Sequence, residues 1–306
     1  MRSHIRRLLI KAGNIISEPI LHNQLEILER QRELFLAQRS NKEMQLLLSM
    51  RYKKMLLDKV PLPTFDEVEF RCFSQNGEDG ILLYIFSLIG VTNKKAVEVC
   101  AGDGTECNTT NLIVNHGWTG LLFDGDKEEV KRGRAFYSKC RDTFLWPPTL
   151  VNEWITAENV DSLISMHGFE GDIDLLSLDM DGNDYWVWKS IDCISPRVVV
   201  LEYNNLLGPE RSATIPYRPD FRAELGELGM DYGGASLTAF VKLGREKGYR
   251  LVGCQRYGFN AFFVRSDVGR DIFPEIPTSK CFEHPFAQHA MKTRFANIES
   301  MNWIDV

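Results

Sequence analysis

The stretch Lys95-Ala-Val-Glu-Val-Cys-Ala-Gly-Asp-Gly-Thr-Glu-Cys-Asn-Thr-Thr-Asn111 decides the fold. It predicts a buried strand over 96–99, a tight glycine turn over 101–104 and a helix that begins near Asn108. Glycine has no Cβ and tolerates positive φ, so the backbone of such a turn can approach a ligand closely. The first N–H groups of the following helix lack helical partners and can face that ligand. The stretch therefore indicates a nucleotide-type pocket, or else only a tight connection.

Strands and helices alternate regularly on both sides of this turn. Ser74 with Gly77-Glu78 indicates the opening of a helix, and an apolar run over 81–89 follows it. We then expect strands over 96–100, 120–123, 149–153, 174–178 and 197–201, and helices over 108–116, 127–139, 157–167 and 184–191. This alternation predicts an α/β fold with a parallel sheet and helices on both faces. A long loop over 209–235, a helix over 237–247 and an antiparallel hairpin over 249–255 and 260–265 follow. The tail, 266–306, is expected to be irregular.

The composition describes an ordinary globular chain with an uneven distribution of charge. Of 306 residues, 44% are hydrophobic and 25% are charged, and the net charge of −6 argues against bulk nucleic-acid binding. Residues 1–60 hold twelve Lys/Arg and six Asp/Glu, a net of +6, so the remainder carries −12. We therefore expect a basic helical arm over 1–65 and an α/β body over 66–306.

Apolar residues recur at helical spacing in the arm, starting at Leu21. The arm can pack on the body, form an oligomerising coiled coil or lie on a membrane surface, and the spacing leaves all three open. No apolar run approaches the ~20 residues that span a bilayer. Seven scattered cysteines without a C-x-x-C pair fit a reducing compartment. We expect a cytoplasmic protein, with peripheral contact at the inner face of the membrane as one role for the arm.

Polar residues follow each expected strand. Right-handed crossovers bring the carboxyl ends of parallel strands to one edge of the sheet. One crevice should therefore be lined by Gly102–Gly104, Asp124 and Asp126, Glu153 and Trp154, Asp179 and Asp181, and Glu202 and Asn204. In open α/β folds, the acid that follows the second strand accepts hydrogen bonds from ribose hydroxyls, which is the role predicted for Asp124. The alternative is a polar turn without a ligand.

Three motifs resemble those of one enzyme family. The turn Glu98-x-Cys100-x-Gly102-x-Gly104 resembles the acid-x-Gly-x-Gly-x-Gly turn of class I S-adenosylmethionine-dependent methyltransferases, with Cys100 in place of the first glycine. Ser74-Gln-Asn-Gly-Glu-Asp79 and Asp174-Leu-Leu-Ser-Leu-Asp-Met-Asp-Gly182 are similar to motifs of the FkbM-type branch, with Ser177 where lysine is usual. The resemblance covers residues 73–265 and leaves out the arm and the tail.

The resemblance implies a seven-stranded class I methyltransferase (Rossmann-like) sheet whose last hairpin is antiparallel, and methyl transfer to an oxygen atom. It also implies that S-adenosylmethionine is the cofactor. Within the implied cofactor site, Glu98 and the glycine turn hold the methionine part, Asn108 and Thr109 its carboxylate, and Trp154 the adenine. The full predicted cofactor-binding set is Glu98, Ala101, Gly102, Asp103, Gly104, Asn108, Thr109, Asp124, Asp126, Trp154 and Asp179.

Acidic residues follow two neighbouring strands, Asp179 and Asp181 after one and Glu202 with Asn204 after the next. Carboxylates this close need a hard divalent cation or a shared proton. Mg²⁺ bound by these four residues would lower the pKa of an acceptor hydroxyl, an arrangement similar to that of catechol-type O-methyltransferases. Without a metal, Asp181 and Glu202 are the candidate catalytic bases. In the alternative, Asp179 meets the cofactor amine, Asp181 caps a helix and Glu202 forms an ion pair.

The predicted acceptor contacts are Tyr203 and Asn205, because aromatic faces and amides suit sugar rings. We expect an O-methyltransferase that acts on a sugar hydroxyl of a bacterial surface glycan or its lipid-linked precursor. One alternative is a glycosyltransferase that uses Asp179-Met-Asp181 as a metal-binding D-x-D motif. Another is a catalytically silent scaffold whose arm recruits partners. The spacing of the glycine turn disfavours an NAD-dependent enzyme.

Overall fold

A computed structural model of the chain describes residues 41–223 and 231–306. The predictions for residues 1–40 lie outside the described residues. The chain divides into two units, 1–48 and Ser49–Val306, and a helix over 41–57 crosses the boundary between them. No helix in the described ranges is both long and apolar enough to cross a bilayer.

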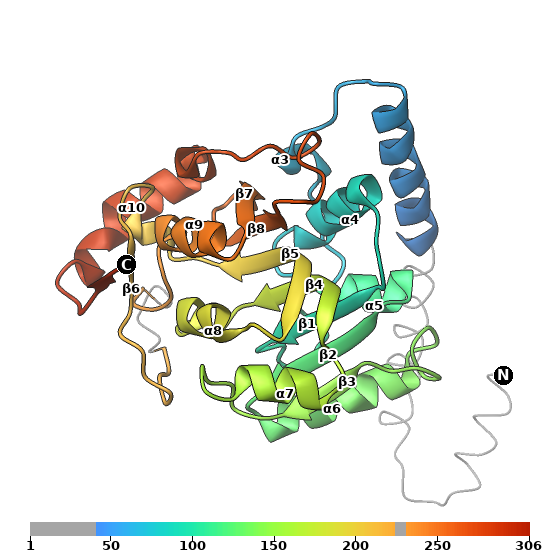
Figure 1. Ribbon diagram of the computed structural model, residues 1–306, viewed down its shortest axis with the longest axis horizontal. Coiled ribbons are helices and arrows are strands. Elements are labelled where there is room, and N and C mark those ends of the chain that lie inside the picture. Colours follow the sequence, from blue (N-terminus) through green and yellow to red (C-terminus); the bar gives the residue numbers. More distant parts are fainter. Residues whose placement is uncertain (1–40, 224–230) are drawn as a thin grey trace, which may run out of the picture. The chain divides into compact units, whose positions relative to one another are not determined.

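The body of the protein is built on a seven-stranded sheet in the order β3-β2-β1-β4-β5-β8-β7 (Figure 1). Strands β1 to β5 run parallel, and β8 lies antiparallel between β5 and β7. The predicted α/β class with its C-terminal antiparallel hairpin is confirmed. The strands are β1 (Lys95–Val99), β2 (Thr119–Asp124), β3 (Thr149–Asn152), β4 (Gly171–Leu178), β5 (Ile194–Glu202), β7 (Tyr249–Cys254) and β8 (Asn260–Arg265).

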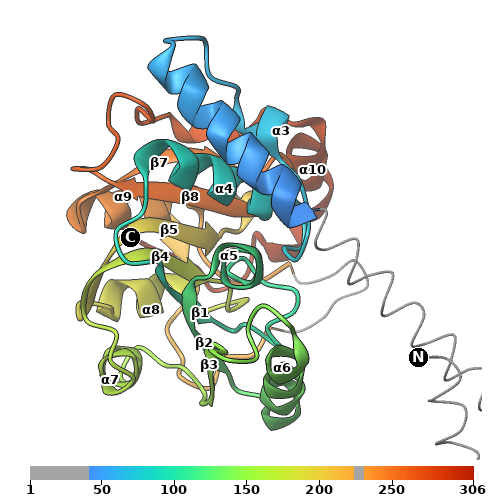
Figure 2. The same ribbon diagram turned by 90° about the vertical axis from the view of Figure 1, so that its right-hand side faces the viewer.

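Helices cover both faces of this sheet. Figure 2 shows α7, α8 and α9 on one face, with α4, α5 and α6 on the other. These helices are α4 (Glu78–Ile89), α5 (Thr110–His116), α6 (Lys127–Lys139), α7 (Val160–Met166), α8 (Asp184–Ser190) and α9 (Leu237–Glu246). The central strands are apolar on both faces, because each face packs against helices. Trp188, Phe240 and Phe263 are fully buried in the core beneath α8 and α9.

The expected boundary at residue 65 differs from the structural one, which falls after Leu48. Phe65 opens the short helix α3 (Phe65–Val68) and contributes to an aromatic cluster of the body. Its ring meets those of Tyr84, Phe262 and Phe273 edge-on. The proline-containing segment before α3 therefore belongs to the body.

The prediction of an irregular tail is wrong. Residues 266–306 contain the 3-10 helix η2 (Thr278–Phe282), the 14-residue helix α10 (Pro285–Ile298) and strand β9 (Ile304–Asp305). Strand β9 pairs with β6 (Ala213–Thr214) from the long loop. The buried face of α10 consists largely of Ala287 and Ala290, which give little hydrophobic signal in a sequence.

A buried ion pair fixes the amino ends of the central strands. The carboxylate of Asp174 on β4 accepts the backbone N–H groups of Thr92, Asn93 and Lys94 at 2.7 to 2.9 Å. It also accepts the Arg197 guanidinium at 3.0 Å, and Arg197 in turn donates to the carbonyls of the α4 C-terminus. Burial alone would raise the pKa of Asp174, but these donors lower it.

Candidate cofactor and acceptor sites

The turn after β1 has the backbone of a glycine-rich loop even where the residue is not glycine. Cys100 has φ 61°, Gly102 has φ 57° and Gly104 has φ 68°, all in the left-handed region. The turn is tied to β2 by the N–H of Ala101, which donates to the carbonyl of Phe123 at 2.9 Å. The departure at Cys100 therefore changes the side chain without changing the path of the chain.

Replacing Cys100 by glycine is expected to raise the free energy of unfolding by up to about 1 kcal/mol. A left-handed residue with a Cβ costs ~1–2 kcal/mol, and the entropy of the added glycine offsets part of this gain. Urea denaturation measures the change. A Cys100→Ala variant removes the thiol but keeps the strain, and equal stability of the two variants would contradict the explanation.

At the start of α5, the structure pairs the predicted cofactor residues Glu98, Asn108 and Thr109 with one another. The buried Glu98 carboxylate accepts the backbone N–H groups of Asn108 and Thr109, each at 2.9 Å. Ser177 donates to Glu98 at 3.0 Å, and the Asn108 amide donates to Ser177 at 3.0 Å. A carboxylate suits the positive end of a helix. Glu98, Asn108 and Thr109 therefore hold the end of the glycine turn against the start of α5.

Asp124 links the glycine turn to the loop after β2. Its two carboxylate oxygens accept the N–H groups of Gly102 at 2.8 Å and Asp126 at 2.7 Å. Asp126 caps α6 by accepting the N–H of Glu128 at 2.7 Å. Asp103 has a local role, because its carboxylate accepts the N–H and hydroxyl of Thr105. Of these acids, Asp124 and Asp126 line a cavity.

This first cavity has a volume of about 340 Å³ and lies at the carboxyl ends of β1 to β4. Such a volume lies at the lower end of the range for small-molecule sites. The lining residues Met180 and Asn183 and the lining segment Phe221–Ala223 of the long loop were not predicted from the sequence. It is lined by Cys100, Phe123, Asp124, Gly125, Asp126, Glu153, Trp154, Ile155, Met180, Asp181, Asn183, Phe221, Arg222 and Ala223.

Trp154, the predicted adenine-binding side chain, lines this cavity. The indole is 43% exposed, and its N–H donates to the carbonyl of Pro219 at 2.7 Å, which fixes its orientation. The guanidinium of Arg222 lies 4.8 Å from the ring centroid, so the ring already stacks against a flat group. Gly125 leaves room for the ring, since a Cβ there would lie 2.7 Å from it.

Asn183 lines the same cavity and has a buried, unsatisfied side-chain oxygen. Its side-chain amide donates to the carbonyl of Arg218 at 2.8 Å, while its Oδ1 is buried without a partner among the described residues. A buried polar atom without a partner is costly and indicates a missing ligand or water. Asn183 is therefore a further candidate for cofactor contact, and no sequence motif marks it.

Asp179, Asp181 and Glu202 come together as predicted. Each offers an oxygen atom within 4.8 Å of the others, close enough to share a cation. Burial raises the pKa of Asp179 and Glu202, and the negative charges of Asp181 and Asp184 raise both further. The interaction between the two carboxyl groups lowers the pKa of Asp179 and raises the pKa of Glu202.

Asp181 has a strained backbone, with φ 56°. Gly233 of the long loop packs directly on its carbonyl, where a Cβ would lie at 2.6 Å. Strained residues that are not glycine persist only where the surrounding structure holds them, and they cluster at functional sites. Asp181 also lines both the first cavity and a second one, so it lies at the junction of the two.

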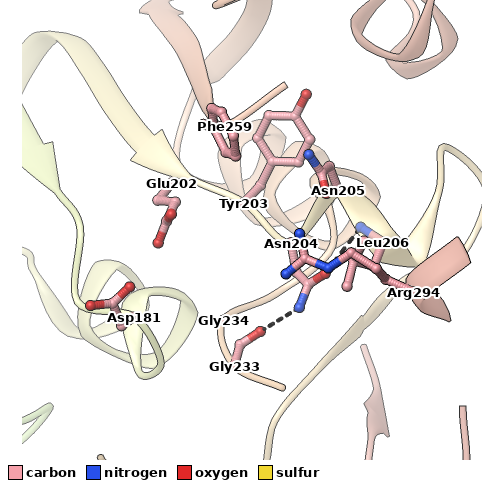
Figure 3. Close-up of a pocket in the computed structure, with 10 residues that line it drawn as sticks. All are labelled: Asp181, Glu202, Tyr203, Asn204, Asn205, Leu206, Gly233, Gly234, Phe259 and Arg294. Carbon is pink, nitrogen blue, oxygen red and sulfur yellow. Dashed lines mark hydrogen bonds between the residues drawn. The ribbon is translucent and has the colours of Figure 1, made fainter. Parts of the chain in front are cut away.

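The second cavity, of about 100 Å³, lies beyond Asp181 and Glu202. Figure 3 shows these two carboxylates on one side, with Arg294 and Asn204 on the other. Arg294 comes from α10, and its guanidinium is paired with Asp231. The cavity is lined by Asp181, Glu202, Tyr203, Asn204, Asn205, Leu206, Gly233, Gly234, Phe259 and Arg294.

The residues predicted around this second cavity have different tasks. Asn204, predicted as a metal ligand, instead holds the long loop: its amide donates to the carbonyls of Asp231 at 2.9 Å and Gly233 at 3.0 Å. Its Oδ1 accepts the N–H of Leu206 at 3.1 Å. Tyr203 is buried, and its hydroxyl donates to the carbonyl of Cys281 at 3.3 Å. Asn205 lines the cavity.

The motif over 74–79 shapes a loop beside Glu202. One oxygen of Asp79 accepts the N–H groups of Cys72, Phe73 and Ser74 at 2.7 to 2.8 Å. The other acid, Glu78, accepts the side-chain amide of Asn260 at 2.9 Å. Asn260 is the register partner of Glu202 on the neighbouring strand. These acids thus fix the loop to the sheet edge where the carboxylates gather.

No protein-family model matches the sequence, and no curated protein matches it. Solved structures similar to the chain include an S-adenosylmethionine-dependent methyltransferase from Clostridium acetobutylicum, 11% identical over 71% of this chain and 97% of the other, with a TM-score of 0.40. A magnesium protoporphyrin IX methyltransferase from Synechocystis PCC 6803, solved with the cofactor bound, is 11% identical over 56% and 69%, with a TM-score of 0.34. Identities and TM-scores this low carry neither the activity nor the substrate of these proteins to the chain.

Proposed function

We propose that the protein is an S-adenosylmethionine-dependent O-methyltransferase of the FkbM-like group. One observation carries the proposal: the strained Asp181 lines both a cavity that suits a nucleoside and a second cavity beside three clustered carboxylates. A cofactor in the first cavity and an acceptor in the second would meet at Asp181. This geometry suits a transfer between two bound molecules, for which positioning contributes most of the rate.

The first cavity offers groups that match each part of the cofactor. Asp124 would accept the ribose hydroxyls, and Trp154 would stack on the adenine. Gly102 and Gly104 would let the turn approach the methionine part, with Ala101 beside them. Bound S-adenosylmethionine would supply the methyl group, which would pass from its sulfonium to the acceptor oxygen and leave S-adenosylhomocysteine.

The carboxylates would prepare the acceptor hydroxyl for this displacement. Asp181 or Glu202 would take the proton of the hydroxyl as a general base. Asp179, Asp181 and Glu202 also match the oxygen ligands that Mg²⁺ prefers, and a bound Mg²⁺ would lower the pKa of the acceptor hydroxyl. Both versions place the acceptor oxygen next to Asp181.

The acceptor that we propose is a sugar hydroxyl of a bacterial surface glycan or its precursor. Asn205 and the guanidinium of Arg294 supply polar groups on the side of the second cavity away from the carboxylates. A hydroxyl-rich acceptor satisfies both, because sugars donate and accept hydrogen bonds. The glycosyltransferase alternative has no use for the glycine turn, which forms part of the cofactor site proposed here.

Calorimetric titration with S-adenosylhomocysteine tests the cofactor half of the proposal. The wild type is expected to bind, and Asp124→Ala is expected to weaken binding by about 10- to 100-fold, since hydrogen bonds to a charged group contribute ~1.5–3 kcal/mol. Asp271→Ala, an exposed acid in the tail, is the matched control and should bind like the wild type. A folded wild type that fails to bind at millimolar ligand would refute the proposal and leave the scaffold alternative.

A further inference from the structure

Three consecutive large apolar side chains lie exposed on the loop between α6 and β3. Phe144 is 52% exposed, Leu145 is 81% exposed and Trp146 is 75% exposed. Two prolines follow them, Pro147 and Pro148. Single exposed apolar residues are normal, but a contiguous group is a mark of an interaction site. We call residues 144–146 the apolar tip.

The loop that presents the apolar tip is ordered by its own hydrogen bonds. The N–H of Phe144 donates to the carbonyl of Cys140 at 2.9 Å, and that of Trp146 donates to Thr143 at 3.0 Å. The buried Thr143 hydroxyl donates to the carbonyl of Tyr137 in α6 at 2.8 Å. The side chains are therefore held outward by a formed turn, so binding them would not require the loop to fold.

The surroundings of the apolar tip are basic, although the protein as a whole is acidic. Residues 127–147 contain six Lys/Arg and three Asp/Glu, a net of +3 in a chain of net charge −6. Lys139 and Arg141 lie five and three residues before the tip and are exposed, as is Asp142. Basic residues next to a membrane-facing segment are attracted to anionic lipid headgroups.

We propose that the apolar tip inserts into the interface of an anionic lipid membrane while Lys139 and Arg141 contact the headgroups. Tryptophan favours the boundary between headgroups and acyl chains, and Phe and Leu add apolar area below it. A second copy of the chain is a poorer occupant. Three residues on a convex turn bury far less than the ~1,200–2,000 Å² of a stable interface, and a symmetric contact would bring two positive regions together.

This membrane contact is separate from the proposed cofactor and acceptor sites. The apolar tip precedes β3, at the amino end of the strand, whereas Glu153 and Trp154 follow the strand and line the first cavity. Figure 1 shows the loop between α6 and β3 on the side away from the strand tips. A change at the tip can therefore be tested without changing the binding of S-adenosylhomocysteine.

Co-sedimentation of the full chain with vesicles tests the proposal. The wild type is expected to bind vesicles that contain phosphatidylglycerol, and to bind them more weakly at high salt. Its binding to vesicles of phosphatidylcholine alone should be weaker still. The double variant Leu145→Ser, Trp146→Ser is expected to lower the partition coefficient by about tenfold or more, because it removes most of the apolar area. Lys139→Glu with Arg141→Glu should lower binding to anionic vesicles and remove most of its salt dependence.

The matched control is Met166→Ser, which removes an equally exposed apolar side chain (75%) at the end of α7. It should bind vesicles like the wild type. Vesicle binding by the tip double variant equal to that of the wild type would overturn the proposal, because another segment would then carry the contact. A wild-type dimer that the tip variant abolishes, seen by sedimentation velocity, would also overturn it and assign the tip to a second copy.

Discussion

A Glu202→Gln variant is expected to transfer methyl groups about 10²- to 10⁴-fold more slowly than the wild type at saturating acceptor, measured as the rate at which S-adenosylhomocysteine is formed. The substitution keeps the shape of the side chain but removes one of the three carboxyl groups that lie within 4.8 Å of one another. The variant can neither take the acceptor proton at this position nor supply the same ligand charge to a cation. The rate is measured with a panel of sugar acceptors.

The expected signature separates Glu202 from the cofactor residues. Glu202→Gln should leave the affinity for S-adenosylhomocysteine unchanged, because Glu202 lines the second cavity rather than the first. Glu210→Gln, an exposed acid on the following loop, is the matched control and should keep the wild-type rate. Wild-type turnover by Glu202→Gln would remove the carboxylates from the reaction.

Removal of divalent cations decides between the two proposed roles of the cluster. A wild-type rate that falls in EDTA and returns with Mg²⁺ would support cation binding by Asp179, Asp181 and Glu202. A rate that EDTA leaves unchanged would support Asp181 or Glu202 as the base. Both outcomes are consistent with a large effect of Glu202→Gln, so the chelation experiment adds independent information.

Asp174→Ala is expected to destabilise the fold by about 3–5 kcal/mol, the cost of leaving a buried charge without its partner. Arg197 would lose its carboxylate, and the backbone N–H groups of Thr92, Asn93 and Lys94 would lose their acceptor. Urea denaturation at neutral pH measures the loss. Asp172→Ala is the control on the same strand, since its ion pair with Arg265 is exposed on the aspartate side and contributes ~0–1 kcal/mol.

The stabilisation by Asp174 should also depend on pH. Its pKa is lowered in the folded protein, so its contribution is fully present above the unfolded value of ~3.9. The contribution is lost as the pH falls through the lower, folded pKa. The difference in unfolding free energy between wild type and Asp174→Ala should therefore shrink on acidification from pH 5 to pH 2. A constant difference over that range would contradict the assigned ion pair.

Local patterns were sufficient to predict most of the sheet and its acidic edge. Helix α6 begins and ends at the predicted residues, because an acidic cap and a basic last turn mark its limits. The cluster of Asp179, Asp181 and Glu202 followed from topology alone, since parallel strands end at one edge. The glycine turn was recognisable despite Cys100 because the spacing of Glu98, Gly102 and Gly104 is kept, and Cys100 adopts the left-handed φ that glycine would adopt.

The residue roles that the sequence did not predict all depend on contacts between residues that are distant in the sequence. Glu98 was assigned to the cofactor, but it accepts N–H groups from residues ten and eleven positions later. Asn204 was assigned to a metal, but its partners lie in a loop some thirty residues away. Arg294 lines the second cavity from a helix with an alanine-rich buried face. No local pattern reports such pairings.

Arg294 reaches the second cavity from α10, so the C-terminal helix contributes to the proposed acceptor site. The first cavity is built from residues at strand ends and the long loop, whereas the second also takes Arg294 from a helix outside the span of the family resemblance. Under the function proposed here, substitutions in the C-terminal helix are expected to change the acceptor while the binding of S-adenosylmethionine stays the same. Exchange of residues 285–298 between homologues would be a direct route to altered acceptor range.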